Sequence, residues 1–195
     1  LILAQSDAIK KEIETVTETK CIYFPSWPEE KISEEKLNFD EIKEKSNFEY
    51  LRIMFTGNIG EAQSFETMIK AASILKKKVK VEWFIIGEGR WKKKLNSKII
   101  EFGLQSEIKL FNSVPITKIK SCFDRADVLY LSLKDNPTFR KTIPGKLQTY
   151  MSSGKPIIAS ISGEAYNLIN NANCGLVSEA EDYEGLANNI LKFIN

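Results

Sequence analysis

The sequence predicts an α/β fold in which a parallel β-sheet is covered by helices on both faces. From residue 51 onward, short apolar runs alternate with segments whose apolar residues recur at helical spacing. Such apolar runs are typical of strands buried on both sides, as in the parallel sheet of a Rossmann-like domain. Right-handed crossovers then place every strand-to-helix loop at one edge of the sheet, where ligands of these folds bind.

The composition is that of an ordinary globular protein and excludes several kinds of site. The chain has 195 residues, which suits one large domain or one domain plus part of another, and 43% of them are hydrophobic. A net charge of +2, from 28 basic and 26 acidic residues, indicates no nucleic-acid partner. The absence of histidine excludes His-based zinc sites, Ser-His-Asp triads and histidine general bases within the chain.

The cysteines and the apolar runs favour a cytoplasmic protein. Cys21, Cys122 and Cys174 are odd in number and widely spaced, which suggests neither a metal site nor a disulfide framework. No signal peptide is visible, and no apolar run reaches the roughly 20 residues that span a bilayer. Because the chain starts at Leu1 and residues 1–4 already have a strand pattern, we expect a piece of a longer protein.

The first 47 residues are predicted to be the end of a preceding domain and a linker. Residues 1–4 and 21–24 have the apolar pattern of short strands, and Ser6 or Asp7 suits the cap of a helix between them. Residues 29–47 are highly charged with few apolar positions, so we expect a linker with one weak helix.

The second domain is expected over residues 48–195. Its strands share short apolar runs, predicted at 51–56, 81–86, 108–111, 128–133, 157–160 and 175–177. Its helices share apolar residues at helical spacing, predicted at 65–76, 91–102, 116–123, from Pro144 to Gly154, 165–170 and 183–194.

The loop after the first of these strands contains Gly57, Asn58 and Gly60, with Gln63 just beyond. Glycines there let backbone N–H groups approach a phosphate, and the following helix adds the positive end of its dipole. The alternative is a tight turn, because Gln63 stands where a GxGxxG motif has its third glycine.

The next two loops offer polar groups at the same edge. Gly87, Glu88, Gly89 and Arg90 follow the second strand, where Arg90 could reach a phosphate and Glu88 a hydroxyl group. Both could equally be the solvated start of a helix. The third loop, residues 111–114, suits the edge of a flat base or is a plain turn before the next helix.

The stretch from Phe139 to Ser160 combines a cationic loop, a helix N-terminus and a buried strand. Arg140, Lys141 and Lys146 stand beside Pro144 and Gly145, an arrangement that holds an anion over an open α/β sheet. A polar loop over 132–137 precedes it, and long loops at the ligand edge are commonly functional. No DxD pair ends a strand, so we expect no metal and no other cofactor.

Four motifs in register resemble the C-terminal domain of retaining GT-B glycosyltransferases of family four, in the branch that makes bacterial O-antigen, capsule and colanic acid. They are FTGNIGEAQSFETMIKAA, FIIGEGRWKKKL, VPITKIKSCFDRADVLYLSL and IPGKLQTYMSSGKPIIAS, and the resemblance covers about residues 50–195. LAQSDAIKKEI and YFPSWPEE are similar to the end of the acceptor domain and its crossover.

The resemblance implies metal-free transfer of a sugar, with retention, from a nucleotide-sugar donor, which we expect to be UDP-linked, to a lipid-linked or saccharide acceptor. The full-length protein would include the missing acceptor domain and could bind peripherally at the inner membrane face. Lys146 and Arg140 would stabilise the leaving diphosphate. The remaining donor-binding positions would be Gly57, Asn58, Gly60, Gln63, Gly87, Glu88, Gly89, Arg90, Asn112, Val114, Lys141, Pro144, Gly145, Gln148 and Thr149.

The sequence departs from the family pattern at the charged positions. Many members carry two glutamates eight positions apart where this chain has Lys141 and Thr149, and Gln148 could take over one hydrogen bond to the ribose. Asn58 and Ser64 replace an arginine and a lysine, which places more weight on Lys146 and Arg140.

Two other functions are alternatives to the glycosyltransferase. The missing carboxylates favour a non-catalytic nucleotide-binding or assembly module of Rossmann-like fold. A dinucleotide-dependent oxidoreductase is disfavoured, because GxGxxG and an acidic residue at the expected distance of about 20 residues are absent.

Overall fold

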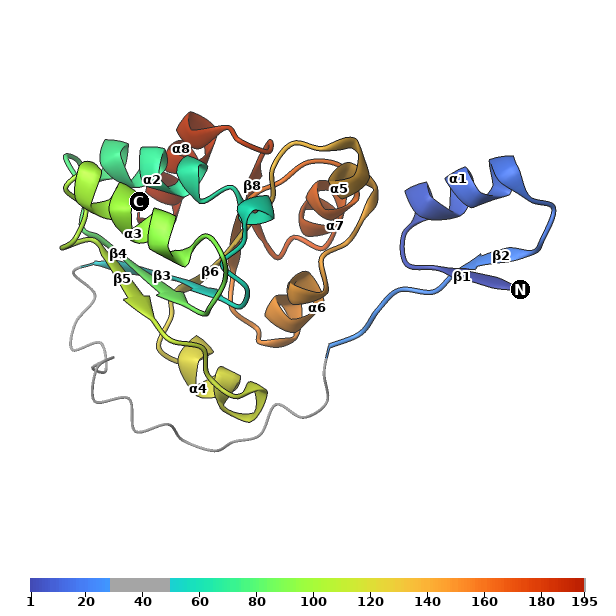
Figure 1. The fold of residues 1–195 in the computed structure, drawn as a ribbon, viewed down its shortest axis with the longest axis horizontal. Helices are drawn as coiled ribbons and strands as arrows, with labels where there is room; N and C mark the ends of the chain where they lie inside the picture. The colour runs from blue at the N-terminus through green and yellow to red at the C-terminus, as the bar shows by residue number, and fades with distance from the viewer. Residues whose placement is uncertain (29–49, 195) are drawn as a thin grey trace.

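The computed structural model describes residues 1–28 and 50–194, which form two separate parallel sheets (Figure 1). The predicted linker, its weak helix and the domain boundary near Asn47 lie outside the described residues. None of the helices in the described ranges is long and apolar enough to cross a membrane.

The N-terminal segment has the predicted strand–helix–strand order. β1 (Ile2–Ala4) and β2 (Cys21–Tyr23) pair in parallel, and α1 (Asp7–Val16) connects them. Ser6 caps α1, because its hydroxyl oxygen accepts a hydrogen bond from the amide of Ile9 at 3.2 Å.

The larger sheet has six parallel strands in the order β5-β4-β3-β6-β7-β8. The strands are β3 (Leu51–Thr56), β4 (Val81–Ile86), β5 (Ile108–Phe111), β6 (Val128–Ser132), β7 (Ile157–Ser160) and β8 (Gly175–Ser178). These bounds agree with the predicted strands to within a residue at each end, and the parallel α/β fold is confirmed.

Helices cover both faces of this sheet. They include α2 (Phe65–Leu75), α3 (Lys92–Glu101), α4 (Ile119–Phe123), α6 (Gly145–Ser152), α7 (Glu164–Asn171) and α8 (Tyr183–Ile194), and short 3-10 turns cover Glu61–Gln63 and Ile116–Lys118. Alternate residues of β3 enter two cores: Ile53 and Phe55 pack with α2, α3 and α8, while Met54 packs with α4, α6 and α7.

The strand order reverses between β3 and β6. From β3 the chain moves outward to β4 and β5, and it then returns to the other side of β3 to form β6, β7 and β8. The connections after β3 and β6 therefore lead in opposite directions, and ligands of open α/β sheets bind at the carboxyl ends of the strands where the order reverses.

One helix was not predicted. α5 (Pro137–Lys141) begins within the expected polar loop, so Arg140 and Lys141 lie in a helical turn and not in a cationic loop. Its start has a local cause: the Asn136 side chain accepts a hydrogen bond from the Thr138 amide at 2.8 Å, and Pro137 occupies the first helical position.

Candidate functional site

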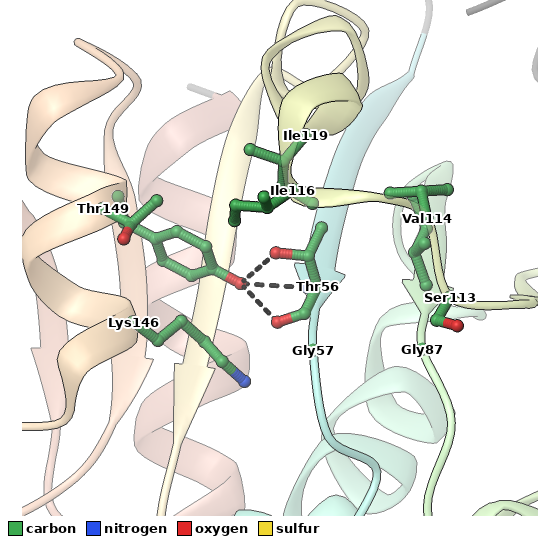
Figure 2. A pocket seen from close by; sticks show the side chains of 11 residues that line it. Thr56, Gly57, Gly87, Ser113, Val114, Ile116, Ile119, Lys146 and Thr149 are labelled. Atoms are coloured by element: carbon green, nitrogen blue, oxygen red, sulfur yellow. Dashed lines mark hydrogen bonds between the residues drawn. The ribbon is translucent and has the colours of Figure 1, made fainter. Parts of the chain in front are cut away.

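A pocket of about 230 Å³ lies at the carboxyl ends of β3 and β4, between α6 and the turn that leads into α4 (Figure 2). Its position is at the sheet edge that the sequence predicted for a ligand. It is lined by Thr56, Gly57, Ile86, Gly87, Ser113, Val114, Ile116, Ile119, Lys146, Thr149 and Tyr150.

Lys146 reaches from the first turn of α6 toward the end of β3 (Figure 2). Its Nζ atom lies 3.6 Å from the centre of the Phe55 ring, so the ammonium group packs on an aromatic face. A Cβ atom at position 57 would lie 3.2 Å from the Lys146 Cε atom and 3.3 Å from Nζ. Gly57 therefore leaves the space that the lysine side chain occupies.

The charge of Lys146 is not compensated in the part of the chain that the structure describes. No carboxylate there pairs with it, and no other residue that lines the pocket is charged. Burial lowers the pKa of Lys146 to about 7, because removing an ammonium group from water disfavours its charged form. An anionic ligand would supply the missing counter-charge.

Tyr150 joins α6 to the end of β3. The Thr56 amide donates a hydrogen bond to the Tyr150 hydroxyl at 3.0 Å, and the Thr56 hydroxyl lies 3.4 Å away (Figure 2). Complete burial raises the pKa of Tyr150 to about 12, so its hydroxyl stays protonated. This bond holds α6, and with it Lys146, at a fixed height above the sheet edge.

The side of the pocket opposite Lys146 is largely apolar. Val114, Ile116 and Ile119 line it, and the loop after β5 supplies the side chains of Ser113 and Val114 (Figure 2). Apolar walls with a few polar groups are typical of small-molecule sites. Because this apolar wall faces a cation, the pocket suits a ligand that has a flat base and an acidic group.

Two of the predicted glycines are required where the first two loops pass each other. A Cβ at position 87 would lie 1.8 Å from the Gly57 carbonyl oxygen, and one at position 89 would lie 2.2 Å from the Ile59 carbonyl oxygen. Ile59 also donates a backbone hydrogen bond to the Glu88 carbonyl at 2.7 Å. Gly87 lines the pocket, whereas Gly89 supports the loops from outside its lining.

Several predicted donor-binding residues bind neighbouring parts of the chain. Gln63 accepts a hydrogen bond from the Gly60 amide at 2.9 Å and so closes the turn after β3. Lys92 links the next two loops, because its Nζ atom lies 2.6 Å from a Glu88 carboxylate oxygen and 3.0 Å from the Asn112 side-chain oxygen.

The cations before α6 are engaged outside the pocket. Arg140 forms a two-pronged ion pair with Asp135, at 2.6 and 2.9 Å, and the hydrogen bonds from Arg140 lower the pKa of that carboxyl group. Lys141 pairs with Glu12 of α1 at 2.7 Å, and its carbonyl accepts a hydrogen bond from Ser6. Lys141 therefore holds the N-terminal segment against α5.

Other predicted residues do not line the pocket. Arg90 is exposed after β4, and the side chain of Asn58 lies beside Gly60. Gln148, with its amide turned so that both atoms are satisfied, donates to the carbonyls of Pro144 at 2.8 Å and Gly145 at 3.0 Å.

The pocket thus brings together Gly57, Gly87, Val114, Lys146 and Thr149 from the predicted set. The residues that sequence reasoning did not single out are Thr56, Ile86, Ile116, Ile119 and Tyr150. Apart from Thr56, they have the apolar character of core residues, and Tyr150 indeed packs in the core while its hydroxyl group faces the pocket end of β3. In the described ranges, no three Cys, Asp or Glu side chains gather as a metal site requires.

Comparison with known proteins gives glycosyltransferase relatives. The family profile "Glycosyl transferases group 1" matches residues 38–195. The colanic acid biosynthesis glycosyltransferase WcaL of Salmonella typhimurium is 24% identical over 145 residues, which is 73% of this chain and 36% of that protein. The chain therefore spans about a third of the length of this curated relative.

Solved structures share the fold at low sequence identity. Anabaena Alr3699/HepE, solved in complex with UDP-glucose, has a TM-score of 0.75 and 16% identity over 100% of this chain and 54% of its own. WaaG, a glycosyltransferase involved in lipopolysaccharide biosynthesis, has a TM-score of 0.72 and 16% identity over 98% of this chain and 52% of its own. With the family profile matching well over half of its residues, this chain belongs to the group 1 glycosyl transferases.

Proposed function

We propose that the pocket beside α6 binds the nucleoside diphosphate of a sugar donor, and that the chain is the donor-binding half of a retaining glycosyltransferase. The observation that supports this most strongly is Lys146, a half-buried cation in the pocket with no carboxylate partner among the described residues. An unpaired charge at such a site costs stability, which is expected where the charge has a functional role.

The proposed chemistry follows from the charge that develops on the leaving group. As the bond between the sugar and the diphosphate breaks, the diphosphate gains negative charge. A cation fixed beside it stabilises the transition state more than the bound donor and so accelerates the step. Lys146 would supply this charge without a metal ion, and Tyr150 would position it through Thr56.

In this proposal the base and ribose would lie on the other side of the pocket. Val114 and Ile116 offer an apolar surface, and Ser113 offers a hydroxyl group. A uridine base is our proposal, because the neighbour HepE was solved with UDP-glucose. A surface-polysaccharide acceptor, lipid-linked or saccharide, is proposed from the name of WcaL. The full-length protein would then work in the cytoplasm, at the inner membrane face.

The proposal gives Arg140 and Lys141 different roles. Arg140 stays a predicted diphosphate ligand, although it must share its guanidinium group with Asp135. Lys141, paired with Glu12, would hold the N-terminal segment in place. Many family members have a glutamate at position 141 for the donor sugar, and this chain has no carboxylate there.

A thermal-shift experiment tests donor binding directly. UDP is expected to stabilise the chain more than GDP, ADP or dTDP at equal concentration, and Lys146→Ala is expected to abolish the shift. Lys77→Ala is the matched control, because Lys77 is exposed beyond the end of α2. A wild-type chain indifferent to all four nucleotides at millimolar concentration would refute the proposal.

The second candidate is a nucleotide-binding module that does not catalyse, favoured by the missing carboxylates at Lys141 and Thr149. The full-length protein separates the two. Sugar transfer or donor hydrolysis supports the enzyme, whereas bound nucleotide with neither reaction supports the module.

A further inference from the structure

The chain offers few groups that can change protonation near neutral pH. It contains no histidine, the side chain that ordinarily titrates between pH 5 and 8. Lys146 is half-buried, and the ten other residues that line its pocket are all uncharged. A proton exchanged in this pocket near pH 7 would therefore have Lys146 as its carrier.

Most charged side chains at the same sheet edge already have partners in the part of the chain that the structure describes. Lys134, which follows β6, pairs at 2.8 Å with Glu61, which follows β3. Lys92 and Glu88, which both follow β4, pair at 2.6 Å. Before α6, Arg140 pairs with Asp135 at 2.6 Å. The Glu181 carboxylate, beyond β8, accepts hydrogen bonds from the Asp135 amide at 3.2 Å and from Ser64 at 3.4 Å. Arg90 is exposed to solvent.

Tyr150 cannot exchange the proton in place of Lys146. Its hydroxyl accepts the Thr56 amide at 3.0 Å, and burial raises its pKa to about 12. It therefore keeps its proton throughout the neutral range, whether or not a ligand is bound.

We propose that Lys146 takes up a proton from solvent when a nucleoside diphosphate enters the pocket and returns it when the diphosphate leaves. The inference rests on the proposed function, because it requires the diphosphate to lie beside α6. At pH 8 the largely neutral amine of the empty pocket becomes an ammonium group that donates hydrogen bonds to phosphate oxygens. No bond other than N–H forms or breaks in this step.

The physical reason is the change in the surroundings of one nitrogen atom. In the empty pocket, burial lowers the Lys146 pKa to about 7, so most of the side chain is neutral at pH 8. A diphosphate in contact adds opposite charge, which raises a pKa by about 1–3 units. For a rise to about 9, linkage gives an uptake of about 0.8 proton at pH 8 and a UDP affinity about fivefold weaker at pH 8 than at pH 7.

Titration calorimetry measures this uptake. UDP is titrated into the chain at pH 8 in buffers of different ionisation enthalpy, and the dependence of the observed heat on the buffer counts protons. The terminal phosphate of UDP is already ionised at this pH, since its pKa is about 6, so UDP itself takes up none. We expect about 0.8 proton per UDP bound. Uptake below about 0.2 with UDP bound would overturn the inference and leave the proposed function standing.

Lys146→Arg provides a matched control, because a guanidinium group stays charged at pH 8. UDP bound by this variant should take up less than about 0.2 proton, and uptake equal to that of the wild type would contradict the inference. An independent measurement is the NMR titration of the Lys146 side chain in the empty protein. A midpoint near 7 is expected, and a midpoint of about 10, the ordinary value, would overturn the inference. Failure of UDP to bind at all would instead refute the proposed function.

Discussion

Replacing Lys146 by methionine should make the empty protein more stable while it removes nucleotide binding. Methionine keeps a long, unbranched side chain that can pack on Phe55, and it removes the buried charge. The two effects have opposite signs, so a variant that is merely misfolded cannot imitate them. A functional charge that costs stability is a common compromise in active sites.

The magnitude follows from the lowered pKa. The fall from 10.5 to about 7 corresponds to about 5 kcal/mol of destabilisation of the charged form. The Phe55 ring returns about 0.5–2 kcal/mol through its contact with the ammonium group. We therefore expect Lys146→Met to raise the free energy of unfolding by about 3–4.5 kcal/mol at pH 6.

The gain should depend on pH with a definite sign. Below pH 7 the lysine is charged in both the folded and the unfolded state, so the folded wild type bears the full cost of burial. Between pH 7 and 10.5 the unfolded state binds more protons, so wild-type stability rises with pH and the advantage of the variant shrinks.

Urea denaturation at pH 6 and pH 9 measures the difference, with Lys77→Met as the exposed control, which should stay within about 0.5 kcal/mol of the wild type. A Lys146→Met variant that is less stable than the wild type at pH 6 would refute the reasoning. So would a variant that UDP still stabilises.

Three further substitutions test how the pocket is built. Gly57→Ala forces a side chain into a backbone with φ of +120° and toward Lys146, so it should cost about 1–3 kcal/mol of stability and weaken UDP binding in calorimetry. Gly87→Ala places a Cβ 1.8 Å from the Gly57 carbonyl oxygen, and we expect a loss of about 1–3 kcal/mol in urea denaturation as the two loops separate. Tyr150→Phe leaves the buried Thr56 amide without its acceptor and should lower the free energy of unfolding by about 1–3 kcal/mol, and wild-type stability in this variant would contradict that role.

The sheet could be predicted from sequence because its strands are decided by local pattern. The buried runs at 51–56 and 81–86 have no polar alternation, and both are strands with those bounds. The turn α5 was missed although Asn136 and Pro137 signal a helix start, because the polar residues around them favoured a loop.

The site was predicted less completely, because its details depend on pairs far apart in the chain. The position of Lys146 at a helix start, at the same sheet edge as Gly57, followed from the order of strands and loops. The pairing of Lys141 with Glu12 joins residues 129 positions apart, and no local pattern indicates it. The apolar spacing of Tyr150 correctly predicted burial but could not show that its hydroxyl meets the Thr56 amide.

A crystal structure of the chain with UDP would test donor binding most directly. We expect the diphosphate within about 3 Å of the Lys146 Nζ atom, as in charge-assisted hydrogen bonds, and the base against Val114 and Ile116. A diphosphate bound instead to exposed Arg90, away from α6, would contradict the proposed site.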